Sequence, residues 1–347
     1  MGALLSLTSA AVQPVWGILC DRYHCHRVFY VLSSIATPLL YLWIIRSSSV
    51  WELMVCALLS GMFINCIQNM GNGWIASLNV SGCRINYGAA RSCGSLAFAV
   101  MAVIQGQIIR QWGMYGLVVG MAGCGAVCTL AACSLPKGSQ SRSTEESRPS
   151  LREGLSMLIT QRDYMVLILC GFLATFGVAG LAAYYTVHLA NMGAGAVVIG
   201  IGTFAYAIAE VPFLFLFERL VRRVDFRKLV TVCLLCHSLQ CALVGLSPNY
   251  VCAILCMVLQ GPSFGTLVPC LQKYSAEHIP AKYVSTAQLF SSSISLSASM
   301  IFGNLTASAL SRSLSLRGTF LVMSLISFLG FAIFVLYHLK TRRTAVC

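Results

Sequence analysis

Residues 13–27 read QPVWGILCDRYHCHR and join two apolar segments of the chain. Gly17 stands four residues before the pair Asp21-Arg22, and Arg27 follows five residues after that pair. Glycine lets a neighbouring helix approach closely, and an acid beside arginines at a helix end can be held by them or by a neighbouring helix terminus. Taken alone, the pattern is as typical of ordinary helix capping as of a gate, so its meaning depends on the rest of the chain.

The composition is that of a membrane protein. Of the 347 residues, 58% are hydrophobic and 10% are charged, and the mean hydropathy is +0.80. Apolar runs of about 20 residues recur along nearly the whole chain, each long enough to cross a hydrocarbon core as a helix. Backbone groups in lipid must be hydrogen-bonded internally, and the alternation of a barrel is absent. The sequence therefore predicts an all-α polytopic membrane protein.

Eleven segments are expected to span the membrane. A polar stretch, 136–162, is typical of a flexible linker and separates an N-terminal bundle, 1–135, from a C-terminal bundle, 163–347. The expected spans cover 2–19, 28–45, 50–76, 88–109, 113–135, 164–188, 194–217, 229–247, 249–272, 284–311 and 317–338.

The net charge of +13 is explained better by membrane orientation than by nucleic-acid binding. With the loop after the first span placed inside, the inside segments carry 18 Lys and Arg residues and the outside segments carry 4. Because cytoplasmic loops collect Lys and Arg, the linker and the C-terminus are predicted to be cytoplasmic, in the cell membrane.

The side chains of the connecting segments do not suggest an enzyme or a metalloprotein. Most of the 17 cysteines lie in apolar segments without paired C-x-x-C motifs, which indicates packing rather than a zinc site. The loops show no paired carboxylates, nucleophile arrangement or phosphate loop. We expect no metal and no other cofactor.

Three spans carry amide or basic side chains that are costly in lipid and therefore informative. Asn65, Gln68, Asn69 and Asn72 share one helical face, which favours a cavity lining over hydrogen bonding between helices. Arg91 shares a face with Ser95 and Phe98; it is expected to face a water-filled cavity, and snorkelling to the interface is the alternative. Gln288 begins a stripe that continues with Ser292, Ser295 and Ser299, whose role is either substrate contact or close helix packing.

Glu210 is the acid that the sequence places deep in a span, on one face with Tyr206. The other acidic residues fall in loops or near helix ends. Removal from water disfavours the charged form of a carboxyl group, so Glu210 is expected to carry a proton. A protonated glutamate that bonds a neighbouring helix is the alternative. The segments 113–135, 229–247 and 317–338 show little comparable polarity and are expected to support the bundles from outside.

Two short blocks carry a resemblance to a known family. The blocks QPVWGILCDR at 13–22 and YGAARSCG at 87–94 resemble helices 2 and 5 of the oligosaccharide and nucleoside proton-symporter branch of the major facilitator superfamily, which includes lactose permease. The resemblance implies two helical bundles that alternate access. It also implies that Arg91 and Phe98 contact substrate with Ser95 alongside, and that Glu210 couples protons.

Residues 212–227, PFLFLFERLVRRVDFR, loosely repeat the order of residues 14–27. In the second half this pattern is preceded by one more span than in the first. Because such transporters are built from two repeated halves, we expect a first helix to be missing ahead of Met1, which leaves eleven of twelve.

The chain departs from that branch in ways that disfavour a disaccharide. The acidic partner of the helix 5 arginine falls near Ala76, and Gln260 stands near the place of the helix 10 acid. We expect a monomeric secondary transporter of a small polar solute, a sugar, nucleoside or organic acid, coupled to protons, with Gly17, Asp21, Arg22 and Arg27 as its cytoplasmic gate. A multidrug efflux transporter and a truncated membrane protein without transport activity are the alternatives.

Overall fold

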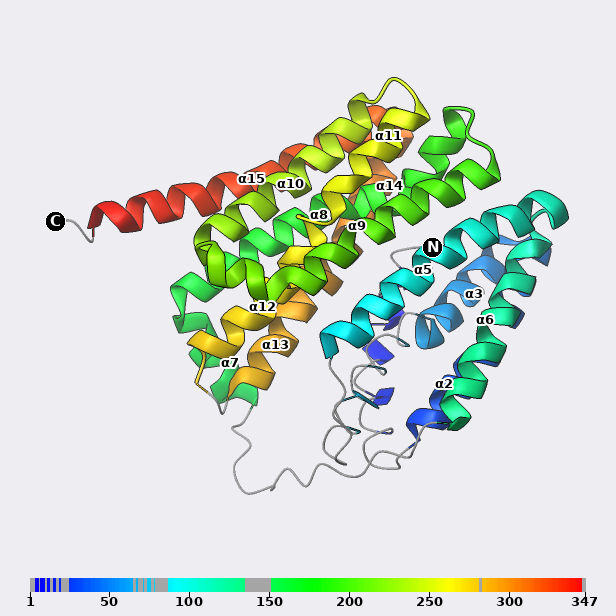
Figure 1. The fold of residues 1–347 in the computed structure, drawn as a ribbon, viewed down its shortest axis with the longest axis horizontal. Helices are drawn as coiled ribbons and strands as arrows, with labels where there is room; N and C mark the ends of the chain where they lie inside the picture. Colours follow the sequence, from blue (N-terminus) through cyan, green and yellow to red (C-terminus); the bar gives the residue numbers. More distant parts are fainter. Residues whose placement is uncertain are drawn as a thin grey trace. The chain divides into compact units, whose positions relative to one another are not determined.

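The computed structural model describes residues 4–5, 7–9, 11–12, 15–16, 19, 25–64, 67, 71, 74–75, 78, 87–134, 151–280 and 283–344. The elements formed by these residues are helices (Figure 1). The chain divides into two compact units. The first comprises Met1–Arg91 and Met101–Glu145, and the second comprises Ser92–Val100 and Glu146–Cys347. The bundle boundaries predicted from the sequence, 1–135 and 163–347, stay predictions.

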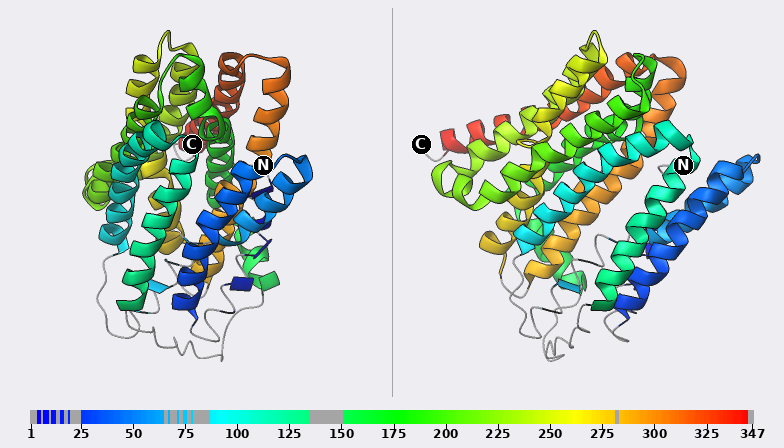
Figure 2. Two further views of the ribbon diagram at one scale, coloured as in Figure 1. Left: turned by 90° about the vertical axis from the view of Figure 1, so that its right-hand side faces the viewer. Right: turned by 45° about the vertical axis from the view of Figure 1, so that its right-hand side comes forward.

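In the first unit, helix α2 (His26–Arg46) packs against α6 (Tyr115–Ser134) and against α3 (Val50–Phe63) (Figure 2). A Cβ at Gly125 of α6 would stand 2.7 Å from the carbonyl oxygen of Ser34, so glycine permits this close approach. A short turn joins helix α5 (Tyr87–Trp112) to α6, and the Gln105 side chain of α5 donates to the Gly116 carbonyl of α6 over 2.8 Å.

The second unit is organised around α8 (Arg162–Asn191). Helix α15 (Leu316–Thr344) runs beside both α8 and α10 (Phe226–Leu246) (Figure 1). The Ser327 hydroxyl of α15 donates to the Ala174 carbonyl of α8 over 2.9 Å, next to Gly177, where a Cβ would stand 2.5 Å from the Met323 carbonyl oxygen. Small residues thus let these helices approach closely, as is usual between helices in membranes.

Two spans of the second unit are interrupted. One consists of α11 (Tyr250–Cys256), the 3₁₀ turn η2 (Met257–Gln260) and α12 (Phe264–His278). Its break coincides with Gly261-Pro262, because proline lacks the backbone N–H that an α-helix needs. The other span consists of α13 (Val284–Ser291), the π-helical η4 (Ser292–Ala298) and α14 (Ser299–Ser313).

The segment just before α8 differs from the prediction. The sequence predicted a flexible linker over 136–162, whereas the structure forms α7 (Leu151–Thr160) inside it. Leu158 of α7 is fully buried and Ile159 is exposed. Burial of one apolar face stabilises a short helix that also carries polar residues.

Nine helices among the described residues are long and apolar enough to cross a membrane. Each overlaps one of the spans predicted from the sequence, and α9 (Ala196–Arg223) is among them. The predicted span 50–76 contains α3 and several residues outside the described part. The predicted span 2–19 is described only in fragments. An all-α polytopic membrane protein is therefore confirmed.

Candidate functional site: a buried polar chain in the second unit

Glu210 lies in the middle of α9, two residues before Pro212, and its side chain is 9% exposed. The Gln260 side-chain amide donates to Oε1 of Glu210 over 2.9 Å. Gln260 ends the turn η2, which can reach α9 because glycine follows it. A Cβ at Gly261 would collide with the carbonyl oxygen of Ala209. The helix break thus brings an amide donor to a buried carboxyl group.

The hydrogen bonding continues from Gln260 to α10. Nε2 of Gln240 donates to Oε1 of Gln260 over 2.8 Å, and the Ser263 hydroxyl donates to Oε1 of Gln240 over 3.2 Å. Gln240, Gln260 and Ser263 are completely buried. We call Ser263, Gln240, Gln260 and Glu210 the polar chain, in which each member donates to the next.

The 3₁₀ turn determines which acceptors the side-chain NH₂ group of Gln240 meets. Side chains three residues apart eclipse in a 3₁₀ helix, so Met257 and Gln260 lie in register. Nε2 of Gln240 is 3.3 Å from Sδ of Met257 as well as 2.8 Å from Oε1 of Gln260. A side-chain amide has two N–H donors, and each of them therefore meets an acceptor of η2.

Further titratable side chains surround the polar chain. Tyr206 precedes Glu210 by one turn of α9, within electrostatic range, and is half-buried. On α10, Nδ1 of His237 lies 3.1 Å from the Cys233 carbonyl oxygen, and the Cys233 thiol donates to the Ser263 carbonyl over 3.1 Å. Tyr185 of α8 is buried with its hydroxyl against α9. Tyr206 and Glu210, predicted to share a face, do so.

The remaining predicted site residues of the described chain lie on other helices. Ser95 is half-buried and Phe98 is 56% exposed, both on α5. Arg91 belongs to the same helix, and the description does not extend to its side chain. Gln288 lies on α13, where its carbonyl accepts from the Ser291 hydroxyl over 2.9 Å. The polar chain does not include these four residues.

The serine stripe serves helix packing at Ser295. The Ser295 hydroxyl donates to the Ile168 carbonyl of α8 over 3.1 Å, and the Ser299 hydroxyl donates to the Ser295 carbonyl over 2.8 Å. A Cβ at Gly171 would lie 3.3 Å from Oγ of Ser295. Of the two interpretations of the stripe, close helix packing therefore describes Ser295, whereas the Ser299 hydroxyl is bonded within its own span.

Most predicted residues of the first unit fall outside the described part of the chain. Arg27 is described and lies half-buried in the first turn of α2. The others are three predicted gate residues and the four amides of the span 50–76: Gly17, Asp21, Arg22, Asn65, Gln68, Asn69 and Asn72.

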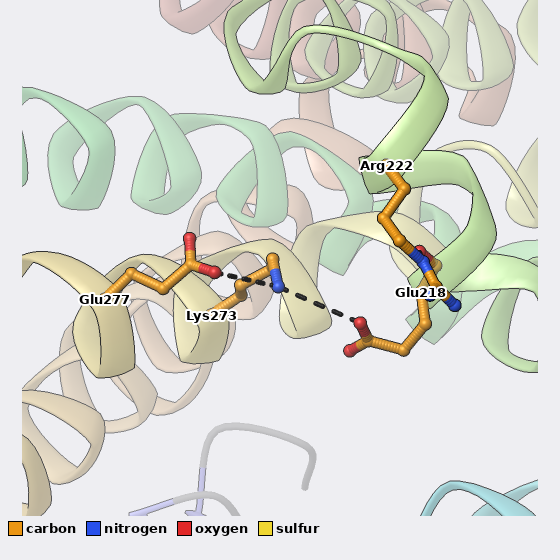
Figure 3. A network of polar contacts seen from close by, with 4 residues as sticks. All are labelled: Glu218, Arg222, Lys273 and Glu277. Carbon is orange, nitrogen blue, oxygen red and sulfur yellow. Dashed lines mark hydrogen bonds and ion pairs between the residues drawn. The ribbon is translucent and has the colours of Figure 1, made fainter.

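Glu218 and Arg222, from the repeated loop pattern of the second half, belong to a cluster of polar contacts with Lys273 and Glu277 (Figure 3). Nζ of Lys273 on α12 lies 2.9 Å from Oε1 of Glu277 and 3.8 Å from Oε2 of Glu218, near the end of α9. Nε of Arg222 donates to the Glu218 carbonyl over 3.1 Å. Because both acids are at least half exposed, each pair contributes little stability. The cluster connects α9 to α12.

Three members of the polar chain, Gln240, Gln260 and Ser263, were not predicted from the sequence as parts of the site. The segment 229–247 was expected to show little polarity, which is wrong, because α10 carries the fully buried Gln240 and His237. Gln260 was expected only to stand near the place of the helix 10 acid of the related branch. The signals available were an amide within an apolar helix and the Gly261-Pro262 pair, which marks a break.

Comparisons with known proteins point to one family. The model described as "MFS_1 like family" matches residues 1–322. The chain is 22% identical to "Uncharacterized transporter YwbF" of Bacillus subtilis (strain 168) over 347 residues, 99% of this chain and 85% of the relative. It is 23% identical to "Maltose permease" of Geobacillus stearothermophilus over 347 residues, 99% of this chain and 86% of the relative.

The fold is similar to solved structures of the nucleoside transporter NupG. A mutant of NupG in which one aspartate is replaced by alanine gives a TM-score of 0.79 at 14% identity, covering 96% of this chain and 89% of that one. NupG itself gives a TM-score of 0.73 at 15% identity, covering 96% and 88%. These neighbours and relatives are transporters rather than enzymes.

Proposed function

Because this chain belongs to the MFS_1 like family and is a membrane transporter of that type, we propose that it is a proton-coupled secondary transporter. It moves a small polar solute by alternating access of two bundles around a central site. It acts as a monomer in the cell membrane, with its C-terminus in the cytoplasm. Protons and the solute are its partners.

The observation that carries this proposal is the burial of Glu210 against an amide donor. A buried carboxylate is costly unless it is hydrogen-bonded. Oε1 of Glu210 accepts from Gln260 over 2.9 Å, and a carboxyl oxygen can accept in both the ionised and the protonated form. Glu210 can therefore lose and regain a proton without breaking that bond, which is what a coupling residue needs.

The proposed substrate is a sugar or a nucleoside. The relatives and neighbours include a maltose permease and a nucleoside transporter, and both kinds of solute are rich in hydroxyl groups. Arg91 orients the solute, Phe98 packs against it and Ser95 lies alongside. Four amides of the span 50–76 line the cavity: Asn65, Gln68, Asn69 and Asn72. Gln288 on α13 contributes a further amide to this lining.

Transport by the purified protein in liposomes tests the proposal. With an alkaline interior, uptake of radiolabelled glucose, maltose and uridine is measured for the wild type and for Glu210→Gln. The wild type should concentrate one of these solutes, and Glu210→Gln should lose accumulation while keeping exchange of labelled for unlabelled solute. Glu153→Gln, an exposed acid of α7, is the control and should accumulate normally. Accumulation by Glu210→Gln would contradict the coupling role.

A further inference from the structure

We propose that Gln260 is a positioning residue for Glu210, and that Gln240 and Ser263 hold Gln260 with its amide nitrogen toward the acid. This inference rests on the proposed role of Glu210 as the proton carrier. It gives a role to Gln240, Gln260 and Ser263, none of which has an ionisable side chain. From the sequence alone, Gln260 is only the residue that stands near the place of an acid in the related branch.

The direction of the polar chain follows from its last member. An ionised carboxylate can only accept hydrogen bonds, so the NH₂ group of Gln260 must face Glu210. The carbonyl of Gln260 then faces α10, and Gln240 must present its own NH₂ group there. The carbonyl of Gln240 is left for a donor, and the Ser263 hydroxyl lies 3.2 Å from that oxygen and 3.2 Å from the backbone carbonyl oxygen of Gln260. The observed contacts of 2.9, 2.8 and 3.2 Å follow this order.

This direction favours the ionised form of Glu210. A hydrogen bond to a charged acceptor is about twice as strong as a neutral one, and successive hydrogen bonds polarise one another in a dry interior. Gln240 and Gln260 are 0% exposed, so water does not compete with them. Removing the amide of Gln260 therefore costs the ionised form more than the protonated form.

The polar chain also ties the proton site to the helix break. Gln260 ends η2, Ser263 precedes α12, and Gln240 lies on α10. The bond from Gln260 to Glu210 consequently connects the broken span to α9, and its strength depends on whether Glu210 is ionised. The titratable groups nearby are Tyr206 on α9, His237 and Cys233 on α10, and Tyr185 on α8. Gly265 is the residue of α12 that faces Glu210.

The competing explanation is that these amides only join helices, as amides in membranes commonly do. Both explanations expect a lower melting temperature when an amide is removed. They differ in the titration of Glu210, because a bond that serves only packing does not distinguish the two forms of the acid. The titration is therefore the decisive measurement.

The experiment follows the protonated carboxyl of Glu210 by pH-difference infrared spectroscopy of the full-length protein in liposomes. The band of Glu210 is the one lost in Glu210→Gln. In Gln260→Met, which keeps the length of the side chain, the midpoint should move to higher pH by about one unit, since the ionised form loses its stronger bond. Gln240→Met should move it in the same direction by less. Gln105→Met, which removes an amide bonded to the Gly116 carbonyl, is the control and should leave the midpoint unchanged.

Each outcome decides the inference separately from the proposed function. An unchanged midpoint in Gln260→Met, while wild-type accumulation still depends on Glu210, overturns the positioning role and leaves the coupling role intact. A shifted midpoint without proton-driven accumulation in the wild type supports positioning and overturns coupling. A spectrum in which no band is lost in Glu210→Gln overturns the inference, because Glu210 would then have no proton for Gln260 to influence.

Discussion

Gly261→Ala should destabilise the second unit and disturb Glu210 at the same time. The new methyl group would collide with the carbonyl oxygen of Ala209 and would lie 2.5 Å and 2.8 Å from ring carbons of Phe213. A backbone carbonyl within a helix cannot rotate away, so α9 and η2 must separate by on the order of 1 Å to restore ordinary contact. Such overpacking costs about 1–3 kcal/mol.

A smaller effect opposes this cost. Replacing glycine by alanine lowers the conformational entropy of the unfolded chain, which stabilises the folded protein by about 0.4–1 kcal/mol where the native backbone tolerates alanine. From the midpoints of the two ranges, the net destabilisation of Gly261→Ala is about 1.3 kcal/mol. Gly123 of α6 has open space at its Cβ position, with no described atom within 4 Å, so Gly123→Ala serves as the matched control and should not destabilise.

Thermal unfolding in detergent measures the difference. A thiol-reactive fluorophore reports unfolding of the second unit, because Cys170, Cys233 and Cys241 are buried there. Gly261→Ala should melt several degrees below the wild type, and Gly123→Ala should not. A Gly261→Ala protein that melts at or above the wild-type temperature would refute the inferred contact between η2 and α9.

Two further substitutions test how stability is distributed in the second unit. Tyr164→Phe removes the hydroxyl that donates to the Ala287 carbonyl over 2.6 Å in a buried place, and should cost about 1–3 kcal/mol in the same melting assay because that carbonyl loses its donor. Lys273→Met breaks the contacts with Glu218 and Glu277, whose carboxyls stay solvated, and should cost less than about 1 kcal/mol. A larger loss in Lys273→Met than in Tyr164→Phe would contradict this order.

The fold could be predicted from the sequence because a span is a local property. The length and composition of an apolar run suffice to identify it, and nine described helices match predicted spans. Helix α7 was missed because its ten residues are too short for such a run. Helix α7 is stabilised by contact with the rest of the second unit through Leu158. Such a contact cannot be predicted from the composition of the segment.

The candidate site was predictable only in part, for a related reason. Glu210 was identified because a charge within an apolar segment is informative by itself. The roles of Gln240 and Ser263 depend on partners 20 and 23 residues away, and a buried amide does not reveal its partner in the sequence. The serines near Gln288 show the same difficulty, since only the contact with Ile168 separates packing from substrate contact.

The break at Gly261-Pro262 and the polar chain depend on each other. In an unbroken α-helix, side chains three residues apart are offset by about 60°, whereas in a 3₁₀ turn they eclipse. Only the eclipsed arrangement puts Met257 and Gln260 together on the NH₂ group of Gln240. Proline removes the backbone donor that would extend the helix, and glycine lets the turn approach α9. A substitution that straightened this span would therefore leave Gln240 with an unsatisfied donor and withdraw Gln260 from Glu210, so the local conformation of η2 sets the environment of the proposed proton site.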